Sequence, residues 1–175
     1  SDGNAIIFAS VRDEGYNLYT HQNATLGLYH GAVHHQSDIY VSLKTDKGWS
    51  KPINLGPTIN TKYVDRSPYL HHDMKTLYFS SDGHGGLGNL DVFVSMRLAD
   101  SCWDCWSEPV NLGKEINNSE ENWGYRIAPN GKDFYYAARE TGANQNDLYS
   151  ITIPEKFRPE AVVNVLGKIT DNQGK

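Results

Sequence analysis

Short runs of apolar and aromatic residues, separated by turn residues, fill most of the chain. Such runs are typical of β-strands, and their near-continuous apolar character predicts strands that are covered on both faces. The clearest runs begin at residues 5, 38, 77, 90, 134 and 147. Asn-Gly at 130–131 stands between two predicted strands and is typical of a tight hairpin turn. No stretch has the apolar spacing of a convincing helix, so the pattern predicts an all-β chain.

Two long motifs each occur twice. The run Trp-Ser-Lys-Pro-Ile-Asn-Leu-Gly at 49–56 returns as Trp-Ser-Glu-Pro-Val-Asn-Leu-Gly at 106–113. Leu-Tyr-Phe-Ser-Ser at 77–81 returns as Phe-Tyr-Tyr-Ala-Ala at 134–138, with the same offset between the two copies. A fixed period of this size indicates supersecondary units that are stacked or arranged radially.

Two further sets of residues follow the same repeat. Ile-Asn at 59–60 returns at 116–117, again with that offset. Asp38, Asp91 and Asp147 each open a strand-like run, and their spacings are slightly shorter than the period of the long motifs. Three units are therefore recognisable.

Tandem units of four antiparallel strands are the sequence form of a β-propeller. We expect a propeller segment at 1–153, made of three four-stranded antiparallel blades at about 5–56, 63–113 and 122–153. The first unit lacks an inner strand, and the third lacks the outer Trp-Ser-x-Pro strand. Because a propeller needs about four to eight blades, we expect this to be part of a larger propeller. The other blades, and a strand that completes the third one, are expected upstream of Ser1.

Three segments fall outside the repeat. Residues 11–37 form a polar insertion that is rich in tyrosine and histidine. Residues 154–160 have the composition of a linker. Residues 161–175 contain a fresh alternating run, which we interpret as the first strand of a following β-sandwich domain.

The composition excludes several classes of partner. The formal net charge is −5 at pH 7 and Lys and Arg form no cluster, which argues against binding of nucleic acid. The mean hydropathy is −0.59 and no window of about 18 apolar residues exists, so no membrane span is predicted. No signal peptide is visible, and the chain is expected to be a piece of a longer protein.

The quoted motifs resemble those of a known family. Leu-Tyr-Phe-Ser-Ser-Asp at 77–82, the glycine-rich loop after it, Asp-Val-Phe-Val-Ser at 91–95 and the Trp-Ser-Glu-Pro-Val-Asn-Leu-Gly run carry the resemblance. Together they resemble the WD40-like propeller repeat of the TolB and tricorn type. More narrowly, the chain is similar over about 5–153 to OmpA-family outer-membrane lipoproteins of Bacteroidota. In that family a carboxypeptidase-regulatory-like sandwich follows the propeller, and residues 165–171 look like its opening.

The resemblance implies a cellular setting. Such proteins are periplasmic, attached to the outer membrane, and carry a peptidoglycan-binding OmpA-like domain after the sandwich. Some belong to the type IX secretion and gliding machinery, where they tie an outer-membrane complex to the cell wall. The resemblance thus implies envelope proteins as partners, and peptidoglycan binding through a domain outside this chain. It brings no catalytic motif and no cofactor.

Cys102 and Cys105 stand in Ser-Cys-Trp-Asp-Cys-Trp, in a loop between two predicted strands. A C-x-x-C pair is compatible with a local disulfide, half of a zinc site or a redox pair. Zinc needs two further ligands, and the seven histidines show no matching spacing. A thioredoxin-like role needs a strand followed by a helix. The context favours a loop disulfide or inert thiols over the other two interpretations.

Gly-His-Gly-Gly-Leu-Gly at 83–88 has the spacing of a dinucleotide-binding loop. That site requires a following helix, whose N-terminus holds the pyrophosphate. A strand is predicted at 90–96 instead, so we interpret the run as a connection between strands.

Residues that recur once per unit are expected to be structural. Asp38, Asp91 and Asp147 are expected to accept backbone N–H bonds at the start of a strand, since catalytic carboxylates would break the repeat. Trp49 and Trp106 are expected to pack on the outer strands.

The histidines leave one hypothesis of a metal site open. His34-His35 and His71-His72 are adjacent pairs, whose side chains point to opposite faces of a strand. Neither pair makes an easy chelate. Convergence of His30, His34 and His84 across loops remains an alternative, although no metal site is predicted.

The candidates for partner contact lie at the start of the inner strands, at positions where the residue differs from one unit to the next. Asp65-Arg66 stands opposite Asn122-Trp123 in the repeat, and Arg126 is added in the third unit. Arginine and tryptophan are typical interface anchors. Arg66, Trp123 and Arg126 are therefore the candidate contact residues.

The sequence as a whole favours a non-enzymatic propeller that acts as a scaffold for protein–protein interaction in the cell envelope. One alternative is a glycan-binding module, which the aromatic insertion at 11–37 suggests. Another is a propeller hydrolase or lyase that uses histidines and a metal.

Overall fold

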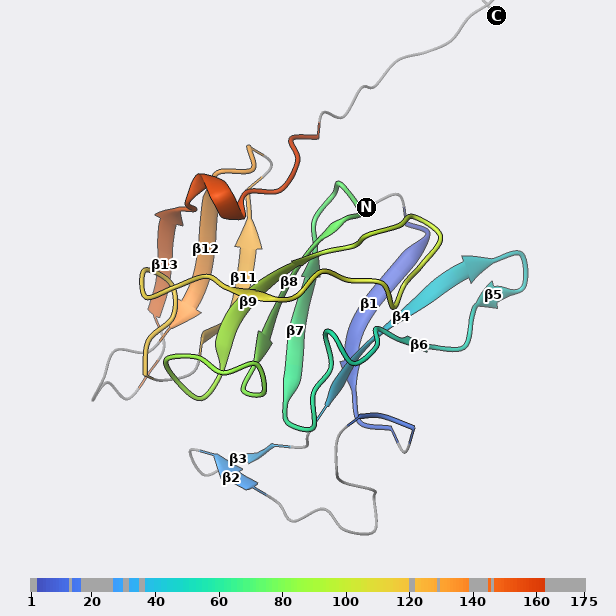
Figure 1. Cartoon of the computed structure of the whole chain (residues 1–175), viewed down its shortest axis with the longest axis horizontal. Coiled ribbons are helices and arrows are strands. Elements are labelled where there is room, and N and C mark those ends of the chain that lie inside the picture. The colour runs from blue at the N-terminus through green and yellow to red at the C-terminus, as the bar shows by residue number, and fades with distance from the viewer. Residues whose placement is uncertain are drawn as a thin grey trace, which may run out of the picture.

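The computed structural model describes residues 3–12, 14–16, 27–29, 32–34, 37–119, 122–128, 130–138, 145 and 147–162. These residues form antiparallel sheets that lie side by side (Figure 1). Among them the helical structure is limited to the short 3₁₀ turn η1 (Glu155–Phe157). None of the sheets closes into a barrel. The prediction of an all-β, antiparallel chain is confirmed.

The first sheet contains β1 (Ala5–Ser10), β4 (Asp38–Thr45), β5 (Gly48–Trp49) and β6 (Ile53–Asn54). β1 pairs with β4 along its whole length, and both β5 and β6 pair with the other side of β4. A separate hairpin of β2 (Gly27–Tyr29) and β3 (Ala32–His34) lies within the insertion. Most of the rest of 11–37 lies outside the described residues.

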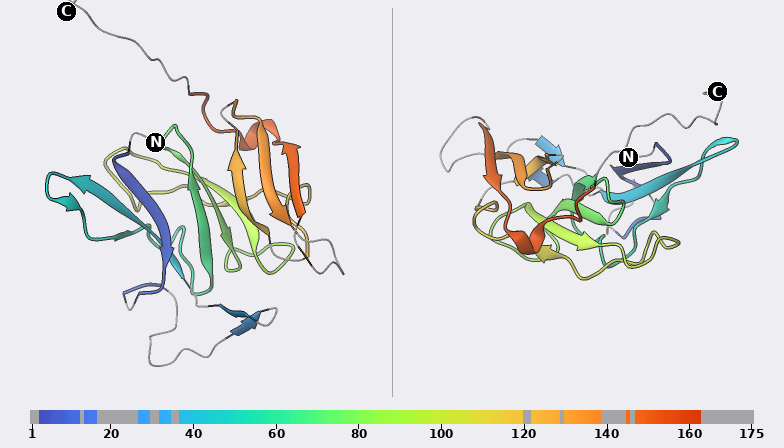
Figure 2. Two further views of the ribbon diagram at one scale, coloured as in Figure 1. Left: turned by 180° about the vertical axis from the view of Figure 1, so that it is seen from behind. Right: turned by 90° about the horizontal axis from the view of Figure 1, so that it is seen from above.

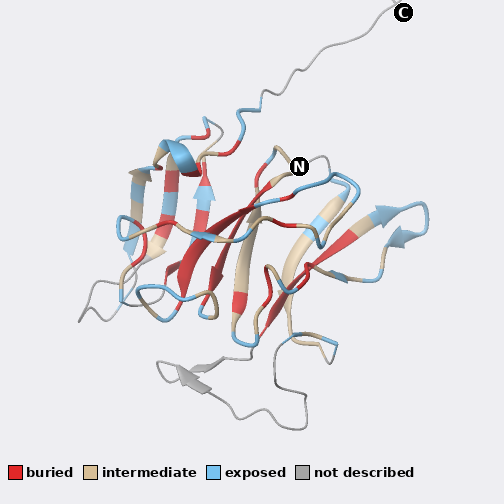
Figure 3. Cartoon of the chain, in the orientation of Figure 1, coloured by how far each residue is buried: buried red, intermediate tan, exposed pale blue. Residues whose placement is uncertain are grey.

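The second sheet is the four-stranded meander that the repeat predicts. Its strands are β7 (Asp65–Leu70), β8 (Thr76–Ser81), β9 (Asp91–Met96) and β10 (Val110–Asn111), in the order β10-β9-β8-β7. Every residue of β8 is buried, so both faces of this middle strand are covered (Figure 3).

The third sheet has three strands, β11 (Asn122–Ile127), β12 (Asp133–Ala138) and β13 (Asp147–Thr152). β12 pairs with β11 on one side and with β13 on the other. An outer strand is missing from the described part of this sheet, as the missing Trp-Ser-x-Pro run leads one to expect.

The outer strands differ from the prediction. The Trp-Ser-x-Pro runs at 49–56 and 106–113 were expected to form outer strands, but each strand is broken in the middle. β5 and β6 are both very short, and the second copy consists of an isolated bridge at Trp106 followed by β10. Pro52 and Pro109 lie within the breaks. Proline has no N–H to donate to a ladder, which explains the interruption in both copies.

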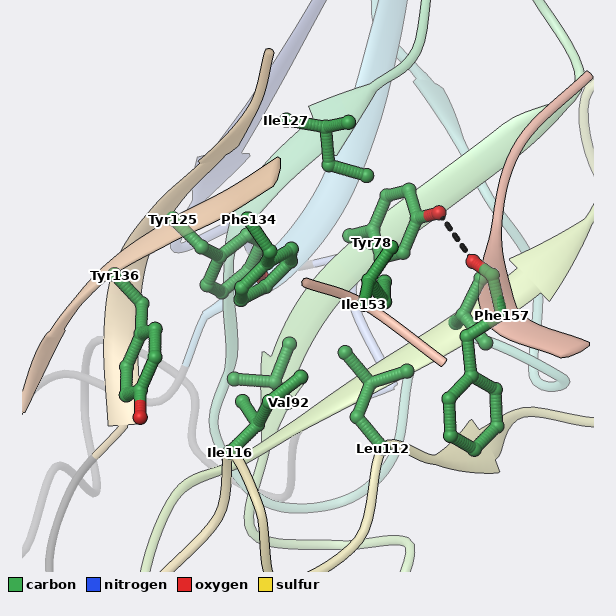
Figure 4. Close-up of a cluster of buried hydrophobic side chains, with 11 residues drawn as sticks. Tyr78, Val92, Leu112, Ile116, Tyr125, Ile127, Phe134, Tyr136, Ile153 and Phe157 are labelled. Carbon is green, nitrogen blue, oxygen red and sulfur yellow. Dashed lines mark hydrogen bonds between the residues drawn. The ribbon is translucent and has the colours of Figure 1, made fainter. Parts of the chain in front are cut away.

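Two clusters of buried side chains hold successive sheets together. The cluster between the first and second sheets includes Ile39, Val41, Leu55, Ile59, Leu77 and Phe79. The cluster between the second and third sheets includes Val92, Val94, Leu112, Ile116, Phe134 and Tyr136 (Figure 4). Each member of the second set stands one repeat after its counterpart in the first set. The two inter-sheet cores are therefore copies of each other.

Backbone hydrogen bonds between sheets are also repeated. The Asp65 amide donates to the Ser37 carbonyl across 2.8 Å, and the Asn122 amide donates to the Leu90 carbonyl across 2.8 Å. Both bonds join the first residue of an inner strand to the residue that precedes β4 or β9. The second sheet thus relates to the first as the third relates to the second, an arrangement that can be followed in two further views (Figure 2).

The segment at 154–160 packs on the sheets instead of extending away from them. Phe157 is buried, and its carbonyl accepts a hydrogen bond from the Tyr78 hydroxyl at 2.6 Å (Figure 4). The Glu160 amide donates to Asp73 Oδ2 at 3.2 Å. The run interpreted as a sandwich strand lies almost entirely outside the described residues.

Candidate interaction face

Both inner strands, β7 and β11, carry a bulge at the same position of the repeat. Their pairing with the next strand shifts between Arg66 and Tyr69 in β7, and between Trp123 and Arg126 in β11. Ser67 and Gly124 lie in the two bulges with φ of +53° and +69°. Glycine adopts such a φ freely, whereas a serine is strained there. A bulge bends its strand and re-aims neighbouring side chains, so the candidate residues lie where the strands turn.

Arg126 lies against Tyr69 of the neighbouring inner strand. The guanidinium carbon of Arg126 is 5.3 Å from the centroid of the Tyr69 ring, a cation–π distance. Arg126 is exposed and Tyr69 is half-buried. Burial raises the pKa of Tyr69, and the positive charge of Arg126 acts in the opposite direction.

Tyr125, next to Arg126 in β11, also joins the two inner strands. Its hydroxyl donates to the Ser67 carbonyl at 2.7 Å, and its side chain is fully buried. Burial raises the pKa of Tyr125, while the charges of Arg126 and Arg66 both lower it. The two arginines therefore lie near the same hydroxyl. Arg66 also favours the charged form of Asp82, although burial dominates and raises the pKa of that carboxyl group.

The structure thus brings Arg66 and Arg126 to adjacent strands. The side chain of Trp123 lies outside the described residues, and its backbone pairs with Ala137. Tyr69 was not singled out from the sequence, although it occupies the repeat position of Arg126 in the second unit. We call Arg66, Tyr69, Trp123 and Arg126 the interaction face.

Two of the three repeated aspartates have the structural role that we expected. Asp38 Oδ2 accepts from the Tyr16 amide at 2.6 Å and from Asn54 Nδ2 at 2.8 Å. Asp91 Oδ2 accepts from the Leu87 amide and from Asn111 Nδ2. Asp147, at the same register of β13, is exposed.

Buried asparagines complete each outer edge, a role that the sequence did not reveal. Asn60 accepts from the Ile39 amide at 2.7 Å and donates to the Ile39 carbonyl at 2.9 Å and to Asn54 Oδ1 at 2.7 Å. Its side-chain amide therefore replaces a peptide group of a neighbouring strand. Asn117 makes the same three bonds, to the backbone of Val92 and to Asn111 Oδ1. We call these two arrangements the asparagine clamps; their signal was the recurring Ile-Asn pair.

Cys102 and Cys105 are joined in a disulfide, with their Cα atoms 5.5 Å apart. The loop that contains them is held by Arg97, which is buried and stacks on the Trp103 ring at 3.9 Å. The Arg97 guanidinium donates to four backbone carbonyls, those of Met74, Ala99, Asp100 and Cys102. Arg97 was also missed in the sequence, where a lone arginine after a strand carries no distinctive signal.

Within the described residues, one group of side chains has the spacing of metal ligands, namely Cys102, Asp104 and Cys105. Both of its sulfurs are engaged in the disulfide, and a disulfide sulfur is not the thiolate that binds zinc. The residues present therefore do not fit a zinc site.

The described histidines are also engaged. His84 contacts the Ile59 carbonyl through Nε2 at 2.9 Å, and its ring lies near those of Phe79 and Phe93. His71 is buried and His72 exposed, as the alternation of neighbouring side chains predicts. The side chains of His30 and His34 lie outside the described residues, and so does their hypothetical convergence with His84.

The glycine-rich run at 83–88 connects β8 to β9, as we interpreted it. A Cβ on Gly83 would collide with the Thr61 side chain, and one on Gly86 would collide with Asp91. These glycines are needed because the loop folds closely over neighbouring side chains.

The two repeated tryptophans are not equivalent. Trp106 is 4% exposed, and its indole N–H donates to the Trp103 carbonyl at 2.8 Å. Trp49 is 48% exposed, so the expectation that it packs on the outer strand is wrong. Trp106 packs in the cluster between the first and second sheets, whereas Trp49 belongs to the first sheet and has no preceding sheet in the described part of the chain.

No helix in the described part of the chain is long and apolar enough to cross a bilayer. No family model, curated protein or solved structure matches the chain.

Proposed function

We propose that the three sheets are consecutive blades of a β-propeller and that the chain is a non-enzymatic scaffold for binding proteins. The observation that carries this proposal is the repetition of the inter-sheet core at equivalent positions of successive units. Two successive interfaces of the same composition generate a constant rotation from sheet to sheet, which is what a radial array requires.

The interaction face is the proposed binding surface. Arg126 is exposed and stacked on Tyr69, so a guanidinium and an aromatic ring are presented together by the neighbouring inner strands β11 and β7. Arginine and tyrosine are frequent hot-spot residues of interfaces, and their preorganisation lowers the entropy lost on binding. The partner class best suited to two arginines on adjacent strands is a protein surface with acidic groups.

The proposed setting is the periplasm, with attachment to the outer membrane and to peptidoglycan through other domains. This part of the proposal rests on the resemblance of the repeat motifs to those of OmpA-family lipoproteins. The net charge of −5 agrees with a partner that is neither nucleic acid nor an anionic membrane surface.

Affinity purification with crosslinking from a Bacteroidota envelope tests the function. The bait is this chain, in wild-type form or with Arg66→Glu and Arg126→Glu together. We expect the wild type to recover defined envelope proteins, and the double variant to lose them because two charges are reversed. Lys132→Glu, an exposed charge reversal in the turn before β12, is the matched control.

Equal recovery by all three baits would remove the interaction face from the proposal. Recovery of polysaccharide without protein would favour the glycan-binding alternative.

A further inference from the structure

β13 has an open edge. It pairs with β12 on one side, and within the described residues no strand lies on its other side. The corresponding strands of the other sheets, β4 and β9, are covered there by β6 and β10. The first and second sheets therefore both show which kind of segment covers the equivalent edge.

Leu148 is an apolar side chain that is left uncovered on this strand. It is 76% exposed, whereas the equivalent residues Ile39 and Val92 are both 0% exposed. Ile39 lies in one cluster with Leu55 and Ile59, and Val92 lies in one cluster with Leu112 and Ile116. Both covering pairs come from the same run, Asn-Leu-Gly-x-x-Ile-Asn, at 54–60 and 111–117.

Polar groups of β13 have the same spacing as those that the asparagine clamps use. Asp147 and Ala138 are paired in register, as are Asp91 and Ser81 in the second sheet. Asp147 is exposed, whereas Asp91 accepts from Asn111 Nδ2 at 3.2 Å. By the same register, the Leu148 backbone corresponds to that of Val92, whose N–H and C=O are both bound by Asn117.

We propose that the open edge of β13 binds an extended segment of the Asn-Leu-Gly-x-x-Ile-Asn type. The first asparagine of this segment donates to Asp147, and the second binds the N–H and C=O of Leu148. Its leucine and isoleucine cover the Leu148 side chain. The occupant is a third segment of this type, because both copies in the chain are already engaged in their own sheets.

β13 keeps only some of the hydrogen-bonding residues with which β4 and β9 bind their outer segments. Ser42 and Ser95 donate to the carbonyls of Ser50 and Ser107 in the outer segments, but Ile151 stands at their position in β13. β13 therefore lacks the hydroxyl that donates to the outer segment at this position, whereas the positions that bind the two asparagines are both retained. This edge is separate from the interaction face, so the proposal holds whether or not that face binds a protein.

A fluorescently labelled peptide with the sequence of residues 49–60 tests the proposal by anisotropy titration against the whole chain. We expect saturable binding that protects the amides of 147–152 from hydrogen exchange. Asp147→Ala should weaken it about tenfold, because the peptide asparagine loses a charged acceptor. Asp46→Ala removes the same charge from an exposed turn and should leave binding unchanged.

The matched control changes the peptide instead of the chain, with Asn54→Asp in the peptide. It places a carboxylate opposite Asp147 and should also bind about tenfold more weakly. Equal binding of the two peptides, protection at β4 or β9 instead of β13, or no binding at millimolar peptide would each overturn the proposal. Concentration-dependent dimers with a protected β13 would overturn it too, because the occupant would then be a second copy of the chain.

Discussion

Asp65 and Asn122 occupy the same place in successive sheets, where one presents a carboxyl group and the other a neutral amide. Each is 0% exposed at the start of an inner strand. Asp65 Oδ2 accepts from the Thr61 amide at 2.5 Å, and Asn122 Oδ1 accepts from the Asn118 amide at 3.0 Å. The geometry is shared, but burial raises the pKa of Asp65 from 3.8 to about 7.

This difference predicts a pH-dependent stability. At Asp65 the folded chain binds more protons than the unfolded chain between the two pKa values, so the contribution of Asp65 to stability is fully present below the unfolded value of 3.8 and is lost as the pH rises through about 7. Asp65→Asn keeps the acceptor oxygen and removes the titration. At pH 8 it should raise the free energy of unfolding by roughly 2 to 4 kcal/mol, with little effect at pH 4.

Urea unfolding from pH 4 to pH 8 measures this. The reverse substitution, Asn122→Asp, is the control and should destabilise the chain more at pH 8 than at pH 4. Parallel pH curves for the wild type and Asp65→Asn would contradict the assignment.

Tyr125→Phe should loosen the contact between the second and third sheets. The substitution removes the hydroxyl that donates to Ser67 and leaves a carbonyl without its partner inside the protein. We expect the free energy of unfolding to fall by about 1 to 2 kcal/mol in a denaturant titration. Tyr136→Phe is the comparison, because its hydroxyl is 3.5 Å from the Glu115 carbonyl and contributes little. Equal losses in the two variants would argue against a specific role for Tyr125.

The asparagine clamps predict large effects from small substitutions. Asn60→Ala and Asn117→Ala each remove three hydrogen bonds and leave a buried backbone N–H unpaired. Each should lower the free energy of unfolding by about 2 to 4 kcal/mol. Asn130→Ala, in an exposed turn, should cost less than about 1 kcal/mol. The measurement is chemical denaturation, and a small effect at Asn60 with a large one at Asn117 would show that the copies are not energetically equivalent.

Arg97 should matter more to the cysteine loop than the disulfide does. Replacing both cysteines by serine opens a very short loop, for which chain entropy predicts a loss of about 2 kcal/mol. Arg97→Met leaves four carbonyls without their donor and removes the stacking on Trp103, so a loss above about 3 kcal/mol is expected. Thermal unfolding in oxidising and in reducing buffer separates the contribution of the disulfide from that of Arg97. A larger loss of unfolding free energy in the cysteine variant than in Arg97→Met would contradict this prediction.

The strands and their pairing were predictable because the apolar and aromatic runs Leu77 to Ser81 and Asp91 to Ser95 are bounded by turn residues and recur at a nearly fixed period. The breaks in the outer strands were not foreseen. Pro52 and Pro109 were in view, but their effect depends on which amides the ladder needs.

The candidate site was predictable only in outline. Arg66 and Arg126 were found because they differ between copies, whereas Tyr69 became visible only through its contact with Arg126. Asn60 binds the backbone of Ile39, and Arg97 binds a loop and the carbonyl of Met74, so both act on residues that are distant in sequence. The recurring Ile-Asn pair marks the position of Asn60 but not its role, which follows from the tertiary arrangement, and Arg97 leaves no local pattern at all.

The two outer segments, 54–60 and 111–117, present the same hydrogen-bonding groups. Either segment could therefore pair with the edge of β4 or with that of β9. A chain that placed 111–117 on β4 would form the same asparagine bonds in an exchanged topology. The native and the exchanged pairing differ only in the length of the loop that joins a strand to its outer segment, and a short loop closes at a lower entropic cost than a long one. The turn at 46–47 keeps the first segment close to β4. The second connection is longer, and the Cys102–Cys105 bond shortens its effective length, so reduction of that bond should favour domain-swapped dimers at high concentration.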